Sequence, residues 1–218
     1  MYLYRLSIST RKRGFLQHIY YQLNNTMYNL NLFEDQMQLN LPVDASKIVL
    51  ENLNWVQYNP RKNIPRYGCS ITSLDGSDSG VPDLDSILEY NTIHNTIYTE
   101  KDFSTPTIHS EPFKEFLNTF QVGRCHYIKL DAGGHFPWHR DIDHGTFRIM
   151  YTVNNCLPLN FVWLEDEKIL KFNDNEWFYI NTRKKHAVFA FCPVVFAVFN
   201  VITNLDNLQK LSNALHIK

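Results

Sequence analysis

The amino-acid sequence predicts a mainly β protein, a sandwich or barrel with flanking helices. After residue 122 the chain contains a series of short segments rich in β-branched and aromatic residues, separated by Gly, Asn, Asp or Pro. About seven such strands at this spacing are typical of sandwiches and barrels. Of the 218 residues, 44% are hydrophobic and no internal repeat is visible, so we expect a single domain over 1–218 with a packed core.

The N-terminal part, residues 1–122, has weak hydrophobic periodicity, and we expect it to support the rest of the fold. Residues 66–86 are dense in Gly, Ser, Asp and Pro, which predicts a long ordered loop. Such a loop is uncommon unless it covers something, so it is a candidate lid or substrate wall; the alternative is a static cap on a sheet. A short helix is expected at 84–90.

A clearer helix is predicted over 109–121. Its apolar residues recur at the spacing of one helical face, Ser110 is a candidate N-cap, and Pro112 falls in the first turn. The predicted face consists of Phe113, Phe116, Leu117 and Phe120. The C-terminal residues 203–218 predict a second amphipathic helix, whose leucines are Leu205, Leu208, Leu211 and Leu215.

The segment 123–202 between these helices is expected to be almost entirely strand and to form the core of the fold. Its apolar stretches are short and end at turn-forming residues, as the strands of a sandwich do. The predicted strands are 125–131, 147–154, 159–165, 168–172, 176–181, 186–191 and 194–202.

Charge and composition exclude several classes of partner. With a formal net charge of −1, the chain has no field that attracts nucleic acid or an anionic membrane. Its longest apolar run, 187–199, is too short to span a bilayer and contains Pro193. The first residues lack the apolar stretch of a signal peptide, and the four cysteines form no C-x-x-C pair. We therefore expect a cytoplasmic protein with reduced thiols.

The stretch "GGHFPWHRDIDHGTFR" contains the residues with the clearest chemistry. His139 and Asp141 are two apart, so on a strand they point to the same side. An imidazole and a carboxylate side by side are two of the three ligands of a 2-His-1-carboxylate site, which leaves open positions on Fe(II). His186, at the start of a later predicted strand, is the candidate third ligand.

A reading without a metal stays open for each of these residues alone. His139 could be a surface histidine paired with Asp141, and His186 could continue the basic run that precedes it. The three together in an all-β segment favour the metal site. His135 and His144 are interpreted as turn and hairpin residues and not as ligands.

Arg148 is a second candidate functional residue because it lies in an otherwise apolar predicted strand. A charged residue is rarely buried without a partner, and the planar guanidinium suits a carboxylate held by two hydrogen bonds. The partner could be 2-oxoglutarate, a usual cosubstrate of such iron sites. The alternative is a side chain that faces solvent.

These residues resemble a known family. "KLDAGGHFPWHRD", "FRIMYTVN" and "EWFYINTRKKHAVF" are similar to the aspartyl/asparaginyl β-hydroxylase-like branch of the Fe(II)/2-oxoglutarate oxygenases. The resemblance covers residues 125–200 well and the N-terminal half loosely. Upstream, "RYGCSITSLDGSDSGVPDLDSILEYN" resembles related sequences of marine viruses and bacteria.

The resemblance implies a double-stranded β-helix, or jelly roll, with iron at its open end. His139, Asp141 and His186 match the metal positions, and Arg148 matches an arginine used against 2-oxoglutarate. One departure is clear, because the family usually carries an arginine near Phe196 on the last strand. Arg148, helped by Tyr127 or Tyr151, then has to bind the cosubstrate, unless the cosubstrate site is altered.

The expected function is that of an Fe(II)- and 2-oxoglutarate-dependent dioxygenase, which uses dioxygen to hydroxylate an aspartyl or asparaginyl residue, a peptide or a free amino acid. The candidate substrate contacts are Tyr67, Asp83, Trp138 and Arg140. The alternatives are a cupin-like metal enzyme that does not use 2-oxoglutarate and a non-catalytic β-sandwich module. The substrate, small molecule or peptide, and the oligomeric state stay open.

Overall fold

The computed structural model describes residues 34–57, 63–141, 145–166 and 168–215. The chain divides into two compact units, Met1–Leu30 and Asn31–Lys218, and all described residues belong to the second. Everything predicted for residues 1–33 therefore lies outside the described residues. Within the described ranges, none of the helices is long and apolar enough to cross a membrane.

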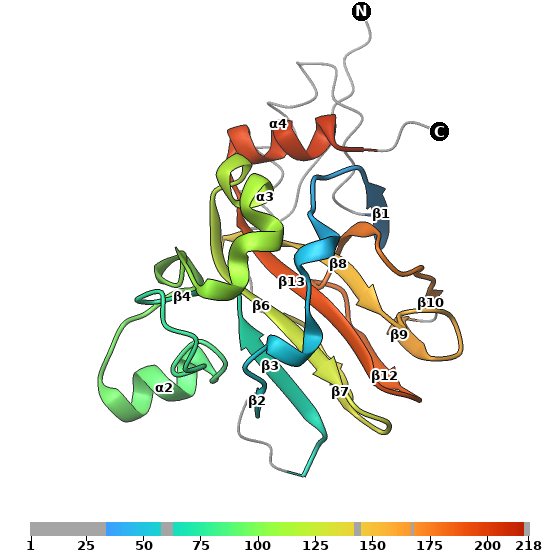
Figure 1. Ribbon diagram of the computed structural model, residues 1–218, viewed down its shortest axis with the longest axis horizontal. Coiled ribbons are helices and arrows are strands. Elements are labelled where there is room, and N and C mark those ends of the chain that lie inside the picture. The colour runs from blue at the N-terminus through green and yellow to red at the C-terminus, as the bar shows by residue number, and fades with distance from the viewer. Residues whose placement is uncertain (1–33, 58–62, 142–144, 167, 216–218) are drawn as a thin grey trace, which may run out of the picture. The chain divides into compact units, whose positions relative to one another are not determined.

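Two antiparallel sheets form a jelly roll (Figure 1). In the described part of the chain, the larger sheet has the strand order β1-β11-β8-β13-β6-β3-β2 and the smaller sheet has the order β10-β9-β12-β7. Consecutive strands from β6 to β13 thus alternate between the sheets, apart from the β9–β10 hairpin, and this interleaving defines the jelly roll. The predicted fold class is confirmed.

The larger sheet contains β1 (Gln36–Leu39), β2 (Val56–Gln57), β3 (Arg66–Ser70), β6 (Val122–Leu130), β8 (Thr146–Asn154), β11 (Trp177–Ile180) and β13 (Val194–Ile202). The smaller sheet contains β7 (His135–His139), β9 (Phe161–Glu165), β10 (Lys168–Leu170) and β12 (His186–Ala190). A further pair joins β4 (Thr72–Ser73) and β5 (Thr105–Pro106). The helices are α2 (Ile87–His94), α3 (Lys114–Thr119) and α4 (Leu205–Asn213), with 3-10 turns η1 (Ala45–Lys47), η2 (Leu50–Asn52), η3 (Glu100–Asp102) and η4 (Ile108–Phe113).

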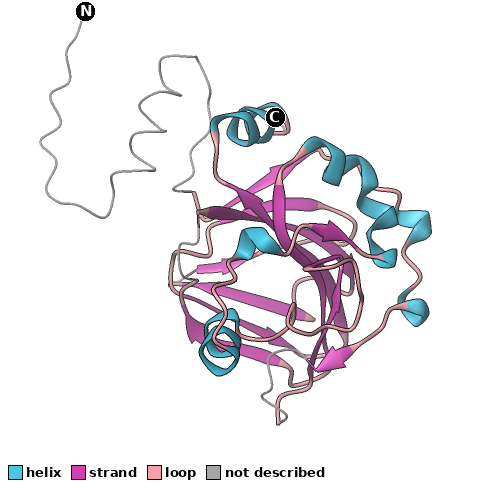
Figure 2. Cartoon of the chain, turned by 90° about the vertical axis from the view of Figure 1, so that its left-hand side faces the viewer, coloured by secondary structure: helices cyan, strands magenta, loops and turns pink. Residues whose placement is uncertain are grey.

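The hydrophobic core lies between the two sheets, because alternate residues of each strand face the opposite sheet. Phe161 and Trp163 of β9 meet Phe196 of β13 across this space, and the rings of Phe161 and Phe196 are 5.2 Å apart. The helices lie at the periphery of the sheets (Figure 2). The seven predicted strands are all present, and β7 is an additional strand that begins at His135.

The predicted helix at 109–121 is shorter and more complex than its periodicity indicates. It begins as the 3-10 turn η4 and continues as α3. The N-cap is Thr107 and not Ser110, because the Thr107 side chain accepts a hydrogen bond from the backbone N–H of His109, whereas the Ser110 hydroxyl donates back to the Thr107 carbonyl. The predicted face is otherwise correct: Phe113, Phe116 and Phe120 are buried.

The prediction of a loop over 66–86 is wrong for its first part, which forms β3 and β4. Strand β3 pairs with β6 in the larger sheet, so tertiary pairing overrides the local preference of Gly and Ser for turns. Ser70 remains satisfied when buried because its hydroxyl donates to Asp83. The remainder is a loop that leads into α2, whose N-cap is Ser86.

Candidate metal centre

The three predicted ligands meet where β7 and β12 lie side by side. His139 is the last residue of β7, His186 is the first residue of β12, and the two are direct partners in the antiparallel register. Asp141 follows β7, and its backbone N–H donates to the carbonyl of Thr182 at 3.0 Å, in the turn before β12. Strand pairing thus brings together residues that are far apart in the sequence.

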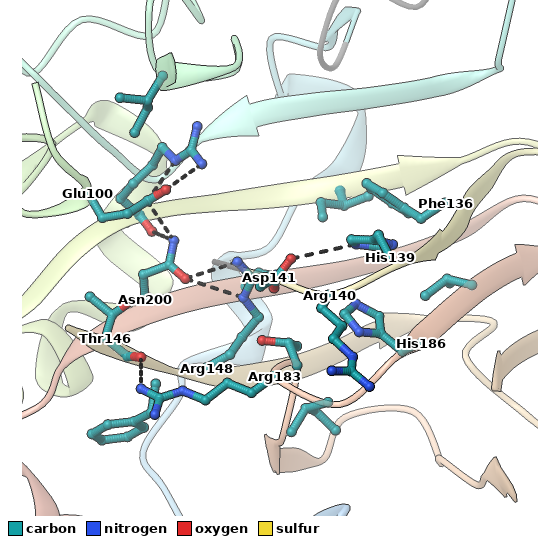
Figure 3. A pocket seen from close by; sticks show the side chains of 18 of the residues that line it. Glu100, Phe136, His139, Arg140, Asp141, Thr146, Arg148, Arg183, His186 and Asn200 are labelled. Carbon is teal, nitrogen blue, oxygen red and sulfur yellow. Dashed lines mark hydrogen bonds and ion pairs between the residues drawn. The ribbon is translucent and has the colours of Figure 1, made fainter. Parts of the chain in front are cut away.

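The donor atoms of these residues converge (Figure 3). One nitrogen from each of His139 and His186 and one carboxylate oxygen of Asp141 all lie within 4.8 Å of one another. His139 Nε2 is 3.6 Å from Asp141 Oδ1, and the two imidazole centroids are 4.2 Å apart. Two imidazoles and one carboxylate therefore face a common point.

Backbone hydrogen bonds fix which imidazole nitrogen faces that point. Nδ1 of His139 is 2.6 Å from the carbonyl of Pro137, and Nδ1 of His186 is 3.0 Å from the carbonyl of Lys184. A carbonyl can only accept, so each Nδ1 carries a hydrogen, and in the neutral form of the ring each Nε2 keeps its lone pair. Metal-binding histidines are commonly oriented in this way.

The environment of His186 favours the neutral imidazole that a metal requires. Its side chain is buried, and the Trp163 ring stacks on it with centroids 5.2 Å apart and planes within 10°. Burial lowers the pKa of His186, because it disfavours the charged form. The imidazole is therefore rigidly held and ready to accept a cation.

The carboxylate oxygen of Asp141 that points away from His139 pairs with a cation. Arg148 Nη1 forms an ion pair with Asp141 Oδ2 at 2.5 Å. Burial acts to raise the pKa of Asp141, but the charge of Arg148, together with smaller contributions from His186, His139 and a hydrogen bond with Thr182, outweighs this effect, and the pKa lies below its ordinary value. Asp141 is therefore a carboxylate at neutral pH, and Oδ1 is the oxygen that faces His139.

A buried carboxylate lies beside the centre. Glu165 of β9 is the cross-strand partner of His186 and is 1% exposed. Burial raises the pKa of Glu165 to about 7, and the nearest cation is Lys184, whose Nζ is 3.9 Å from Oε1. Nothing in the sequence pattern marked this residue.

The three candidate ligands line a cavity of about 660 Å³. Toward the inter-sheet core its wall is apolar and includes Ile128, Trp163, Val188, Phe196 and Val198. The remaining wall includes five arginines and three acidic residues, namely Arg66, Arg124, Arg140, Arg148 and Arg183 with Asp85, Glu100 and Asp141. An apolar pocket with a few polar groups near one point is a usual form for a small-molecule site.

Arg140 and Trp138, the neighbours of His139, have different positions. Arg140 lines the cavity, and its side chain makes no hydrogen bond or ion pair with any described residue. Trp138 is 45% exposed, does not line the cavity, and lies beneath Lys185, whose Nζ is 5.5 Å from the ring centroid. Of the two, Arg140 is placed to contact a ligand.

The structure does not bring Tyr127 and Tyr151 to the cavity. Both are buried on the opposite face of the larger sheet, where their rings lie 5.6 and 5.8 Å from that of Phe113. Side chains alternate along a strand, so Ile128 and not Tyr127 faces the cavity. A contact between either tyrosine and a bound cosubstrate is incompatible with this placement.

Tyr67 and Asp83, the candidate contacts from the upstream segment, are also absent from the cavity wall. Lys129 lies over the Tyr67 ring at 4.7 Å, whereas the neighbouring Arg66 faces the cavity. Asp83 is buried and accepts hydrogen bonds from Ser70 and from the backbone of Leu74. The loop contributes to the cavity through its last residues and α2 instead.

Of the two histidines excluded as ligands, His135 is described and is not part of the cluster. His135 begins β7 instead of lying in the turn, and its ring stacks on Phe189 with centroids 6.3 Å apart. His144 lies outside the described residues.

Comparisons with known proteins do not identify the chain. No family model and no curated protein matches it. Among solved structures, a predicted oxalate decarboxylase from Thermotoga maritima has 12% identity and a TM-score of 0.36 over 75% of this chain and 100% of that one. A conserved protein of unknown function from Streptococcus pyogenes has 11% identity and a TM-score of 0.31, over 37% of this chain and 65% of that one.

An RmlC-like cupin from Shewanella frigidimarina has 15% identity and a TM-score of 0.30, over 39% of this chain and 77% of that one. The chain thus spans less than two thirds of the length of the streptococcal protein. Likenesses of this strength carry no argument about function. The jelly-roll assignment follows from the strand order, and the candidate metal centre from its own geometry.

Proposed function

We propose that the protein is a non-haem iron oxygenase that uses 2-oxoglutarate and dioxygen to hydroxylate an amino-acid or peptide substrate. The observation that supports this proposal most is the convergence of His139, Asp141 and His186, with both Nε2 atoms facing the cavity. This donor set, with open positions, is typical of non-haem Fe(II) oxygenases.

The residues present fit such a metal. Backbone hydrogen bonds orient Nε2 of both imidazoles toward the cavity, burial favours the neutral form of His186, and the carboxylate of Asp141 is ionised and oriented, which suits the binding of a divalent ion. Bound Fe(II) would supply the activation of dioxygen. The chain holds the ligands, and its apolar wall around Trp163 and Phe196 excludes water from the space beside them.

Arg148 is the proposed anchor for a carboxylate of 2-oxoglutarate. A guanidinium has five N–H donors, and Arg148 uses two of them in hydrogen bonds to Asn200 and forms an ion pair with Asp141 through Nη1. Further N–H donors of the guanidinium are therefore available to a ligand. The excess of arginine in the cavity wall also favours an anion.

A second candidate function is that of a metal enzyme that does not use 2-oxoglutarate. Phe196, where the resembling family has an arginine, is buried in the apolar wall of the cavity and offers no contact for a carboxylate. This favours a cupin-like reaction on a different ligand. A non-catalytic module, the third possibility, requires that no divalent metal binds.

Anaerobic titration of the Fe(II)-loaded protein with 2-oxoglutarate separates these functions. We expect a weak visible charge-transfer band, reduced in Arg148→Ala and absent in His186→Ala. Iron binding without the band would support the second candidate, whereas a chain that binds no iron would support the third. Hydroxylation itself would be followed by succinate formation with candidate peptides.

A further inference from the structure

A continuous network of polar side chains leads away from the metal centre (Figure 3). It runs from Asp141 to Arg148, then to Asn200, and then to Glu100, which pairs with Arg124. The family resemblance assigns no role to the last three residues, and the mechanism above does not use them.

Asn200 is the centre of this network. It lies on β13 opposite Arg148 of β8 in the strand register, and it is 2% exposed. Its Oδ1 accepts from Nε and Nη2 of Arg148, both at 3.2 Å. Its Nδ2 donates to Glu100 Oε2 at 3.0 Å and to the backbone carbonyl of Arg124 at 2.9 Å. The amide therefore has one possible orientation.

Only an amide fits between these neighbours. A carboxylate at position 200 would still accept from Arg148, but it would place an oxygen against the acceptors of Glu100 and Arg124. An apolar side chain would remove the acceptor of Arg148 Nε and Nη2 and one donor to Glu100, and would leave these buried groups with unmade hydrogen bonds, which is costly. Position 200 therefore needs a side chain that accepts from a cation and donates to an anion.

The far end of the network is anchored to the fold. Arg124 binds both carboxylate oxygens of Glu100, at 2.8 and 2.9 Å. It also donates to the backbone carbonyls of Asp83 and Asp85, both at 3.0 Å. Glu100 is thus fixed, and Asn200 has a rigid acceptor on the side away from the metal centre.

We propose that Asn200 is a positioning residue for the metal centre. It fixes Arg148 so that Nη1 holds Oδ2 of Asp141, and Oδ1 is left facing His139 for a metal. This inference rests on the metal centre of the proposed function but not on the use of 2-oxoglutarate. It predicts that Asn200, which touches no candidate ligand, determines metal affinity.

Equilibrium binding of Co(II) to the metal-free protein tests this role, with the visible ligand-field bands reporting the coordination. For Asn200→Ala we expect binding about 10- to 100-fold weaker, as is usual when an outer hydrogen-bond partner is lost, together with altered bands. The near-isosteric Asn200→Asp should also weaken binding, because its carboxylate competes with Asp141 for Arg148.

Asn207→Ala is the matched control. Asn207 of α4 is also buried and also bonds through its side chain to the backbone, namely to Gln121 and Ile202. Its loss should lower the midpoint of thermal unfolding in the same way but leave Co(II) affinity and bands unchanged. A purely structural role of Asn200 would give the same pattern as this control.

The outcomes separate the inference from the proposed function. Unchanged affinity and bands in the Asn200 variants, with Co(II) bound by the unaltered protein, overturn the inference and leave the metal centre standing. Failure of the unaltered protein to bind Co(II) overturns both. If Asn200→Ala does not fold, Asn200→Asp decides by the same criterion.

Discussion

Strands β6 and β13 carry two different environments along one face. At one end, Leu130 and Val194 face the opposite sheet and belong to a fully apolar core. At the other end, Arg124 and Asn200 face the cavity and form a network of ion pairs and hydrogen bonds. Both ends are β-strand, so the side chains alone distinguish them. We call the apolar end the packed end and the end that carries Arg124 and Asn200 the reactive end.

The comparison shows that, along one strand, the residues that stabilise the fold and the residues that support the candidate metal centre can lie at different ends. The apolar end stabilises the fold by burying surface, which needs no specific partner. The polar end tolerates burial because each of Arg148, Asn200 and Glu100 has a partner. Substitutions at the two ends should therefore affect different measurements.

The largest expected effect is at the reactive end. His186→Ala removes one of three ligands and should abolish stable metal binding, while folding is retained. The measurement is metal content per chain after dialysis against Fe(II) or Mn(II). His135→Ala, which alters a histidine outside the cluster on the adjacent strand, is the control and should keep full metal content.

At the packed end, Leu130→Ala should lower the free energy of unfolding by about 2–5 kcal/mol, because it opens a cavity in the core. Denaturant unfolding of the metal-free protein measures this change. At temperatures where the variant is folded, its metal affinity should match that of the unaltered protein. A large loss of metal affinity with little loss of stability would contradict the division into two ends.

Acid should affect the metal-free protein through its buried neutral histidines. Burial lowers the pKa of His186 and lowers that of His126 well below the ordinary value of 6.5. Below that pH the unfolded chain binds protons that the folded chain does not, so stability is present above about pH 6.5 and decreases as the pH falls.

Over the pH unit below that value, each of the two histidines can reduce the free energy of unfolding by at most about 1.4 kcal/mol. Denaturant midpoints at pH 7.5 and 5.5 give the size of the decrease. His126→Asn should make the midpoint less dependent on pH. Glu165, whose pKa burial raises to about 7, acts in the opposite direction over this range, so the test is the difference between the variant and the unaltered protein. A pH dependence that is the same in His126→Asn as in the unaltered protein would contradict a buried neutral imidazole at position 126.

The smallest effect is expected for Arg140→Ala at the mouth of the cavity. Its side chain is exposed and makes no hydrogen bond or ion pair with any described residue, so the free energy of unfolding should change by no more than about 0.5 kcal/mol. Metal affinity should also be unchanged, as measured by Co(II) titration. Weaker binding of an anionic ligand alone would assign Arg140 to the ligand and not to the centre.

The sequence predicted those features that depend on residues close together in the chain. The His139-x-Asp141 spacing and a histidine at the start of a strand sufficed to predict the three residues that converge, because strand ends at one sheet edge meet. The apolar runs likewise predicted the strands of the core. Asn200 is the single polar residue in the apolar run of β13. This pattern could have indicated a functional residue, but it was not used in the prediction.

Other features depend on tertiary pairing and could not be predicted. The partners Glu100 and Arg124 come from segments without a motif, and only the folded chain brings them together. Tyr127 was expected to help Arg148 bind the cosubstrate, but its side chain lies on the other face of the sheet, because a shift of one residue changes the face of a strand. The strand β3 was missed because its Gly and Ser residues favour turns when considered locally.

The most direct test of the metal centre is a crystal structure of the protein soaked with Mn(II) or Co(II), with the ion located by anomalous scattering. We expect one strong peak within bonding distance of His139 Nε2, His186 Nε2 and Asp141 Oδ1, with Arg148 still bound to Oδ2. A peak at another site, or none at this one under conditions where the ion is in excess, would contradict the proposed centre.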